Sequence, residues 1–355
     1  MSNTDFCSDA LLDYLYTQTL PTPLPPDYTK DDFSKWQIKK RNEVQDLLRI
    51  QELSNLLSVP VSAQLIEQFY TDDVLIEKYC LQGIRHLNTP LYIAGANNPA
   101  SKSILYLHGH DKFGIQGALK HLEASPYHKY LPLLLAREGY RVYAPEMIGF
   151  GEAHKQHYDM GNSKEGSCFP NGTQLLASGF SLAGLRSFQA MKIVDFMKQQ
   201  SAETISVFGI SGGGMGAMYL SACDSRIDHM ILSGYPCTWP DTLFVHHHCI
   251  DNFVPGMTRI ADGPQIISLF APKPLLLLTG KTDHVFALSG AQKAFSVVRE
   301  AYQIFDCPHQ LQIPRELIIL SAQIDQSFRC LRSMFPEERP LGSVPLCAGQ
   351  RAFAA

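Results

Sequence analysis

The segment 204–216 limits the possible folds more than any other part of the chain. An apolar segment is followed by Gly-x-Ser-x-Gly, centred on Ser211, and then by small residues typical of a closely packed helix. A very tight strand-to-helix turn would hold Ser211 at strained backbone angles, where its oxygen can reach a base. Gly209 and Gly213 would leave room for that turn, and the N–H of Gly212 would face a reacting carbonyl from the helix N-terminus. A glycine-rich turn without chemistry is the alternative interpretation.

Apolar runs of strand length alternate with helical patterns along the rest of the chain. The run 103–107 is continuously apolar, as in a parallel strand buried on both faces. This alternation predicts an α/β fold with a mostly parallel central sheet flanked by helices. The expected strands lie within 74–81, 91–94, 103–109, 140–144, 204–210, 227–232 and 274–278, and the expected helices at 127–139, 175–199 and 291–302.

The two ends of the chain differ from this central pattern. Residues 1–60 form an expected N-terminal helical arm, with a proline-rich linker at 21–26 and helical spacing over 31–57. The arm packs over the main domain or, alternatively, forms a lid. Residues 61–312 form the main domain, and residues 313–355 form an atypical C-terminal segment. No internal repeat is visible.

Composition excludes several classes of partner. The 355 residues are 45% hydrophobic and carry a formal net charge of −4, so electrostatics favours neither nucleic acid nor an acidic membrane surface. No apolar run approaches the ~20 residues needed to span a bilayer, and no secretory signal precedes the chain's core. The 9 scattered cysteines are typical of reduced thiols. We therefore expect a cytoplasmic protein whose partner is a small molecule, in an oligomeric state that the sequence leaves open.

Two further segments follow expected strands and could contribute to a site with Ser211. In His108-Gly109-His110, the N–H of His110 could pair with that of Gly212 as an oxyanion hole. Asp283 lies 72 residues after Ser211, in the order serine, acid, histidine, and could orient a histidine base. The alternative for either segment is an ordinary polar loop, and Asp251 and Asp306 are weaker rivals for the acid.

The run His246-His247-His248-Cys249 raises the question of a metal site. Adjacent residues point their side chains in different directions, whereas a closed zinc site usually needs spaced ligands. The sequence therefore predicts a loop that lines the pocket, with no metal and no cofactor.

Taken together, these motifs resemble the α/β-hydrolase superfamily. More narrowly, they resemble the bacterial esterases grouped with dienelactone hydrolases, acetyl xylan esterases and prolyl-oligopeptidase-like hydrolases. The resemblance covers about residues 30–309 and rests on segments 108–110, 149–152, 181–186, 209–214, 233–237, 248–256 and 280–286. It implies hydrolysis of small carboxylic esters through an acyl-serine, with Ser211 as nucleophile and Asp283 as the acid. An aminopeptidase-like hydrolase is the alternative within the same superfamily.

The C-terminal part departs from the family pattern, which has a last strand followed by a Gly-His turn that supplies the base. Here His309 is the last histidine, and it precedes the expected last strand, which would put it at the sheet edge opposite Ser211. His309 is the predicted base, with His284 and the 246–248 run as alternatives. The departure suggests that the segment after about residue 312 has been replaced. A catalytically impaired protein with a hydrolase fold is therefore a further alternative.

Overall fold

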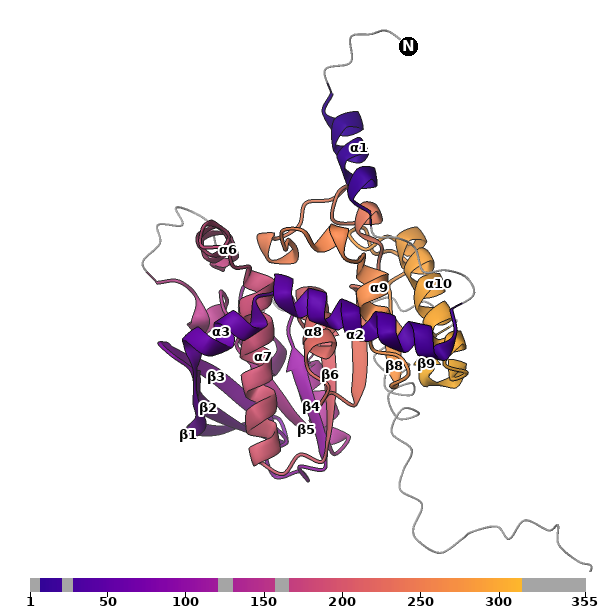
Figure 1. Cartoon of the computed structure of the whole chain (residues 1–355). Helices are drawn as coiled ribbons and strands as arrows, with labels where there is room; N and C mark the ends of the chain where they lie inside the picture. The colour runs from indigo at the N-terminus through magenta and orange to yellow at the C-terminus, as the bar shows by residue number, and fades with distance from the viewer. Residues whose placement is uncertain (1–6, 21–27, 121–129, 157–165, 315–355) are drawn as a thin grey trace, which may run out of the picture.

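The fold is built on one twisted sheet with the strand order β1-β2-β3-β5-β4-β6-β7-β8-β9 (Figure 1). The structure, a computed structural model, describes residues 7–20, 28–120, 130–156 and 166–314. β1, β2, β3 and β5 pair antiparallel, and all pairs from β5 through β4 to β9 are parallel. The predicted, mostly parallel α/β architecture is confirmed. The strands are β1 (Ser58–Thr71), β2 (Val74–Ile84), β3 (Leu87–Ala94), β4 (Lys102–Leu107), β5 (Arg141–Pro145), β6 (Thr204–Ile210), β7 (His229–Ser233), β8 (Leu275–Leu278) and β9 (Leu311–Gln312).

Alternate residues of the central strands face two separate cores. Leu105 and Val207 point into one core, together with buried residues of the helices that cover that face, whereas Tyr106 and Phe208 point into the other. Both faces of β4 and β6 are therefore buried, which explains their continuously apolar sequences. The helices are α1 (Asp9–Thr19), α2 (Lys30–Leu47), α3 (Ile50–Leu57), α4 (Gln116–Leu119), α5 (Leu131–Arg137), α6 (Cys168–Ala177), α7 (Leu182–Gln199), α8 (Gly212–Cys223), α9 (Gly263–Ser268) and α10 (Leu288–Ile304).

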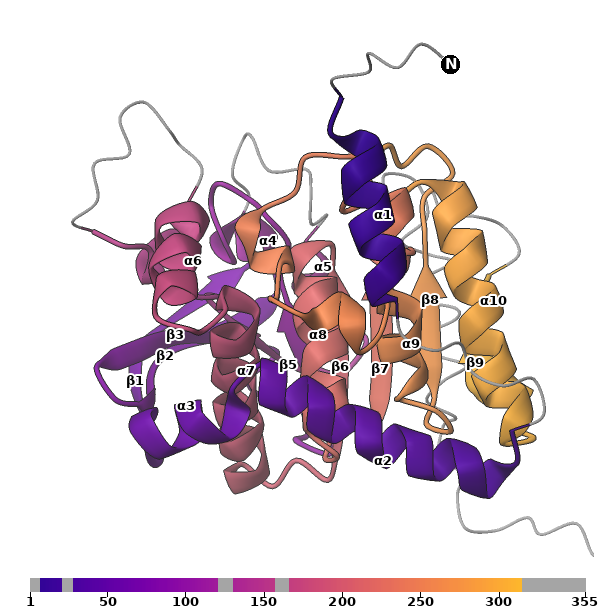
Figure 2. The same ribbon diagram turned by 45° about the horizontal axis from the view of Figure 1, so that its top comes forward.

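Helices α2 and α3 pack on the sheet domain ahead of its first strand. Figure 2 shows α2 lying across the layer formed by α7 and α8 and reaching α10 at its other end. Thr29 and Asp32 form a capping box at the start of α2. The buried Gln37 amide donates hydrogen bonds to three backbone carbonyls, one of them that of Ala271 at 2.8 Å. These contacts explain why α2 packs against the domain as a fixed element.

Two expectations about local structure are wrong. The single helix over 175–199 is in fact two helices, because Gly179 has φ +81° and Ser181 caps α7 by accepting a hydrogen bond from the N–H of Gly184. The helix over 31–57 likewise breaks at Arg49, whose φ is +57°. The sequence also gave no prediction of β1, a largely exposed strand that pairs with β2.

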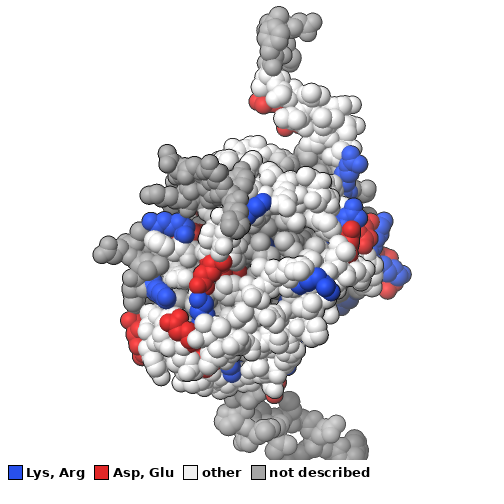
Figure 3. Space-filling model, turned by 90° about the vertical axis from the view of Figure 1, so that its left-hand side faces the viewer, with Lys and Arg blue, Asp and Glu red and all other residues white. Residues whose placement is uncertain are grey.

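The structure describes the chain up to residue 314, so most of the atypical segment 313–355, including its suggested replacement, lies outside the described residues. None of the helices in the described ranges is both long and apolar enough to cross a bilayer. On the face drawn in Figure 3, acidic and basic side chains are interspersed.

Candidate active site

Ser211 occupies the sharp turn between β6 and α8. Its φ of 51° and ψ of −120° are strained for a residue with a side chain. A Cβ atom on Gly209 would lie 2.2 Å from the carbonyl oxygen of Gly213, and a Cβ on Gly213 would lie 2.0 Å from that of Leu107. The backbone N–H of Ser211 donates to the carbonyl of Ser233 at 2.8 Å. The turn therefore has the geometry of a nucleophile elbow, and the two glycines are required because backbone packs directly against backbone.

The loop after β4 lies beside this elbow. A Cβ on Gly212 would lie 2.5 Å from the His110 Nδ1 atom, so the His110 ring and the first residue of α8 are neighbours. Gly212 is the N-terminal residue of α8, where backbone N–H groups have no partner within the helix. The two residues predicted to form an oxyanion hole are thus brought together.

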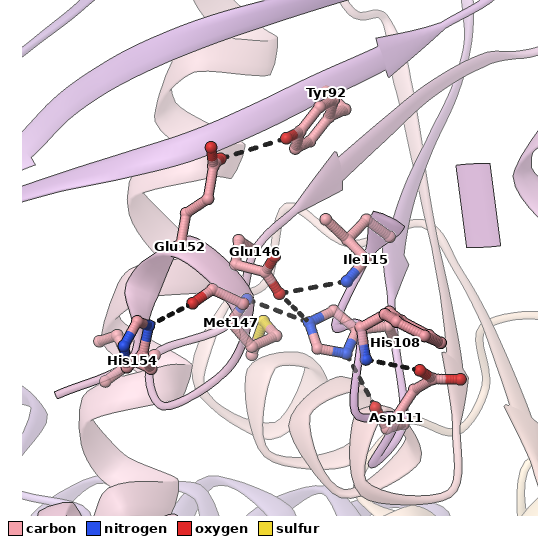
Figure 4. A network of polar contacts seen from close by, with 12 residues as sticks. Tyr92, His108, Asp111, Ile115, Glu146, Met147, Glu152 and His154 are labelled. Carbon is pink, nitrogen blue, oxygen red and sulfur yellow. Dashed lines mark hydrogen bonds and ion pairs between the residues drawn. The ribbon is translucent and has the colours of Figure 1, made fainter. Parts of the chain in front are cut away.

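Figure 4 shows the hydrogen bonds around the buried His108 ring, which set the direction of the peptide that joins Gly109 to His110. The Met147 N–H donates to Nε2 of His108 at 3.1 Å, so this ring carries its proton on Nδ1. Nδ1 lies 2.8 Å from the Gly109 carbonyl oxygen and donates to it. Because a trans peptide points its C=O and N–H in opposite directions, His108 also determines where the His110 N–H points.

Glu146 connects the same loop to the loop after β5. Its side chain is fully buried, and Oε1 lies 3.3 Å from His108 Nε2 and accepts a hydrogen bond of 3.1 Å from the Ile115 N–H. Gly114 and Gly151 both have positive φ, and a Cβ on either would lie 2.0 Å from a Glu146 oxygen. Two loops that are distant in the sequence are therefore fixed around one carboxyl group.

Asp283 forms the turn after β8. Its Oδ1 atom accepts hydrogen bonds from the N–H groups of Val285 and Phe286, at 2.9 and 2.8 Å. Val285 and Phe286 line a pocket of about 680 Å³ that also contains Ser211. Asp283 is thus beside the pocket, at the same edge of the sheet as Ser211, because both follow the carboxyl ends of parallel strands. The pocket is further lined by His110, Phe150, Cys168, Gly212, His248 and Cys249.

The histidines lie at different distances from this pocket. Leu311 pairs with Leu275, the first residue of β8, so His309 lies at the amino edge of the parallel strands, opposite Ser211. His284 is exposed. Among the described residues, no imidazole is hydrogen-bonded to the Ser211 hydroxyl. The structure therefore does not bring His309 and Ser211 together.

His248 is held in the pocket wall through Thr242. The Thr242 hydroxyl donates to the Val285 carbonyl at 2.6 Å and lies 2.9 Å from His248 Nε2. A hydroxyl that donates its proton elsewhere must accept here, so Nε2 of His248 carries the ring proton and Nδ1 keeps its lone pair. Burial and the neighbouring His246 lower the pKa of His248 below its ordinary value.

A second polar cluster lies at the pocket, where His110 and Cys168 are lining residues. His110 Nε2 lies 3.0 Å from Asp251 Oδ2, and the buried Arg186 guanidinium also pairs with Asp251. Arg186 Nη2 donates to Cys168 Sγ at 3.0 Å. Burial would lower the pKa of His110, but the charge of Asp251 and hydrogen bonds to Asp251 and Cys168 outweigh it and raise the pKa to about 9.

The Cys168 thiol and the Asp251 carboxyl of this cluster favour their charged forms. A hydrogen bond with Cys249 lowers the pKa of Cys168. Burial acts in the opposite direction, and the charge of Arg186 lowers this pKa further. Burial would raise the pKa of Asp251, yet the charges of His110 and Arg186 hold it below its usual range. Sequence reasoning named Asp251 only as a weak rival acid and missed Cys168 and Arg186 as site residues. The Ser181–Arg186 segment that supported the family resemblance was the available signal.

Comparisons with known proteins agree with this fold. Residues 8–319 match the sequence profile of the Abhydrolase family. The chain is 24% identical over 251 residues to a protein assigned as a hydrolase, YtaP of Bacillus subtilis, covering 66% of this chain and 78% of YtaP. A protein assigned as an acetyl xylan esterase from Bacteroides fragilis has a similar structure, with a TM-score of 0.72 at 18% identity, covering 92% of this chain and 89% of that protein.

A glucuronoyl esterase from Solibacter usitatus is more distant, with a TM-score of 0.53 at 13% identity over 82% of this chain and 88% of the esterase. At these identities the structural likeness establishes the fold. Because the family profile covers most of the sequence, the chain belongs to the Abhydrolase family and has the α/β-hydrolase fold.

Proposed function

We propose that this chain is a serine hydrolase that cleaves small carboxylic esters through an acyl-serine intermediate. The observation that carries the proposal is the strained elbow at Ser211, which opens into a pocket beside the first N–H groups of α8. The family membership and the esterases among proteins of similar structure support the same class of chemistry.

In the proposed reaction, the Ser211 oxygen attacks the ester carbonyl carbon as its proton passes to a base. The N–H groups of Gly212 and His110 stabilise the negative charge that develops on the carbonyl oxygen. The tetrahedral intermediate collapses, the alcohol leaves with that proton, and Ser211 keeps the acyl group. Water then attacks the acyl-serine by the same sequence of steps and releases the acid. No cofactor takes part in these steps.

For the base, we propose His248 in preference to His309. His248 lines the same pocket as Ser211, and Thr242 orients its ring with the Nδ1 lone pair available. Thr242 also bonds the Val285 carbonyl, in the turn organised by Asp283, so the proposed acid supports the base through that turn. His309 would need to move to the other edge of the sheet.

A catalytically impaired hydrolase-fold protein is the second candidate. The described residues contain no imidazole bonded to the Ser211 hydroxyl, and this observation favours it. Without a base, only the ~10³–10⁴-fold acceleration from oxyanion stabilisation and binding would be left.

Hydrolysis of p-nitrophenyl acetate by wild type and by Ser211→Ala distinguishes an active esterase from a catalytically impaired protein. An active esterase should lose about 10³-fold or more of its kcat on this substitution, towards the ~10⁶-fold loss seen with a complete triad. The exposed Ser225 offers a matched control, since Ser225→Ala should leave kcat unchanged. Rates for wild type and Ser211→Ala within a few-fold of each other would reject the esterase and favour the impaired protein. Acetylated and methyl-esterified sugars then test the substrate class.

A further inference from the structure

Four side chains with metal-binding atoms converge at the pocket, which three of them, His110, Cys168 and Cys249, line. They are His110 from the loop after β4, Cys168 at the start of α6, and Cys249 and Asp251 around a short 3₁₀ turn. One ligand atom from each lies within 4.8 Å of every other. These positions span more than a hundred residues of sequence, so the tertiary fold assembles the cluster.

We propose that His110, Cys168, Cys249 and Asp251 form a binding site for a divalent transition-metal ion, with Zn²⁺ as the best fit. Four ligand atoms around one tetrahedral Zn²⁺ would be about 3.3–3.8 Å apart, so small side-chain movements close the shell. His110 Nε2 and Asp251 Oδ2 are already 3.0 Å apart.

The ligand types favour zinc over the harder ions. Two sulfur atoms, one imidazole nitrogen and one carboxylate oxygen match the ligands that Zn²⁺ takes in proteins, whereas Mg²⁺ and Ca²⁺ prefer oxygen ligands alone. The proposed site differs from a metal site formed by the adjacent histidines 246–248. His246 and His247 are exposed, and His248 is bonded to Thr242, so from that segment the site takes Cys249.

Arg186 completes the charge balance of the proposed site. Zn²⁺ with two thiolates and one carboxylate carries a net charge of −1, which the buried guanidinium neutralises. Arg186 contacts both Asp251 and Cys168, so it would act as an outer partner that orients two ligands. Asn252 supports the site further, because its Nδ2 donates to Asp251 Oδ1 at 2.8 Å.

The position of the site suggests its effect. The His110 side chain is 34% exposed and lines the pocket, which gives an ion a path to the ligands. A bound ion would join the β4 loop, α6 and the segment around residue 250, three parts of the pocket that are separate in the sequence. The inference concerns binding and stands whether or not Ser211 catalyses hydrolysis.

Cobalt substitution tests the proposal without using activity. The reduced full chain, stripped with a chelator, is titrated with Co²⁺ and then with Zn²⁺. We expect one equivalent of Co²⁺ to produce the strong visible bands of a tetrahedral ion and near-ultraviolet sulfur-to-cobalt bands, and Zn²⁺ to abolish both.

Variants then assign the ligands. Cys168→Ser and Cys249→Ser should each weaken Co²⁺ binding by more than the ~10–100-fold that loss of an outer partner costs. Cys80→Ser, at a half-buried thiol in β2, is the matched control and should bind as wild type does. Circular dichroism checks that each variant folds.

Three results would overturn the proposal. Folded, reduced wild type could fail to take up Co²⁺ or Zn²⁺, or its cobalt spectrum could lack the sulfur bands. Alternatively, binding could survive both cysteine substitutions. Detection of a Cys168–Cys249 disulfide in a chain that binds no metal after reduction would assign the two thiols to a redox pair instead.

Discussion

The backbone N–H of Met147, just after β5, donates a 3.1 Å hydrogen bond to Nε2 of His108, just after β4. This bond fixes the tautomer of a fully buried ring, and that ring in turn holds the Gly109 carbonyl. One imidazole thus connects the end of β5 to the loop of the proposed oxyanion hole, and we predict that it positions the His110 N–H.

Replacement of His108 tests this positioning role. His108→Ala frees the Gly109–His110 peptide, so the proposed oxyanion donor no longer points at one place. We expect kcat for p-nitrophenyl acetate to fall by up to about a hundredfold with little change in KM. The exposed His154 offers the control His154→Ala. An unchanged kcat in a folded His108→Ala protein would contradict the role, as would a loss confined to KM.

The glycines of the elbow give a prediction about folding. Gly213→Ala would place a Cβ atom 2.0 Å from a backbone oxygen, so we expect a loss of more than about 2 kcal/mol in the free energy of unfolding, or no folded protein. Gly216→Ala, one turn later in α8, meets side-chain atoms at 3.3 Å or more and should be neutral or stabilising by up to about 1 kcal/mol. Urea unfolding compares the two variants. Equal stabilities would mean that the turn is less tight than described.

Breaking the buried Arg186–Asp251 ion pair should destabilise the protein far more than breaking an exposed ion pair. Both side chains are at most 3% exposed, so Asp251→Asn removes a buried counter-charge of the guanidinium and leaves it only its contact with Cys168 on that side. We expect a loss of about 3–5 kcal/mol in the free energy of unfolding, measured in the presence of a chelator. Asp31, in an exposed pair with Lys35, is the control, and Asp31→Asn should have no measurable effect. A small loss in Asp251→Asn would show that water or other groups compensate Arg186.

His229 predicts a specific dependence of stability on pH. Burial lowers the pKa of His229 below its value of 6.5 in the unfolded chain. The charge of Asp228 acts in the opposite direction, and that of Lys273 lowers this pKa further. The unfolded chain therefore binds this proton first as the pH falls, so the folded state loses stability between pH 6.5 and the folded pKa. Above 6.5 the effect vanishes. His229→Gln should flatten the difference in unfolding free energy between about pH 7 and pH 5, relative to wild type.

The choice of general base can be tested by a pair of variants. His248→Ala should lower kcat by about 10²–10⁴-fold, the usual contribution of a positioned base, while His309→Ala should leave it unchanged. The reason is that His309 lies at the opposite edge of the sheet. The reverse result would reject His248 and indicate that the end of the chain takes a different path.

Local features of the sequence predicted much of the fold. The elbow at Ser211 could be recognised because its strand, turn and helix are contiguous in the sequence. Its two glycines are needed because a Cβ atom at either position would clash with backbone oxygen atoms. The apolar runs of β4 and β6 likewise indicated parallel strands buried on both faces. Strand β1 was missed although its apolar residues alternate with others over 59–65, the period typical of a strand. It pairs with β2.

The sequence by itself determined the tight turn at Ser211 and the alternation of strands and helices. Tertiary structure decided which groups meet: sheet register puts His309 opposite Ser211, and loop packing brings His110, Cys168, Cys249 and Asp251 together. The physical reason is the distance along the chain over which each interaction acts. Backbone strain and side-chain periodicity act over a few residues, whereas a polar cluster depends on contacts between segments that no local pattern relates.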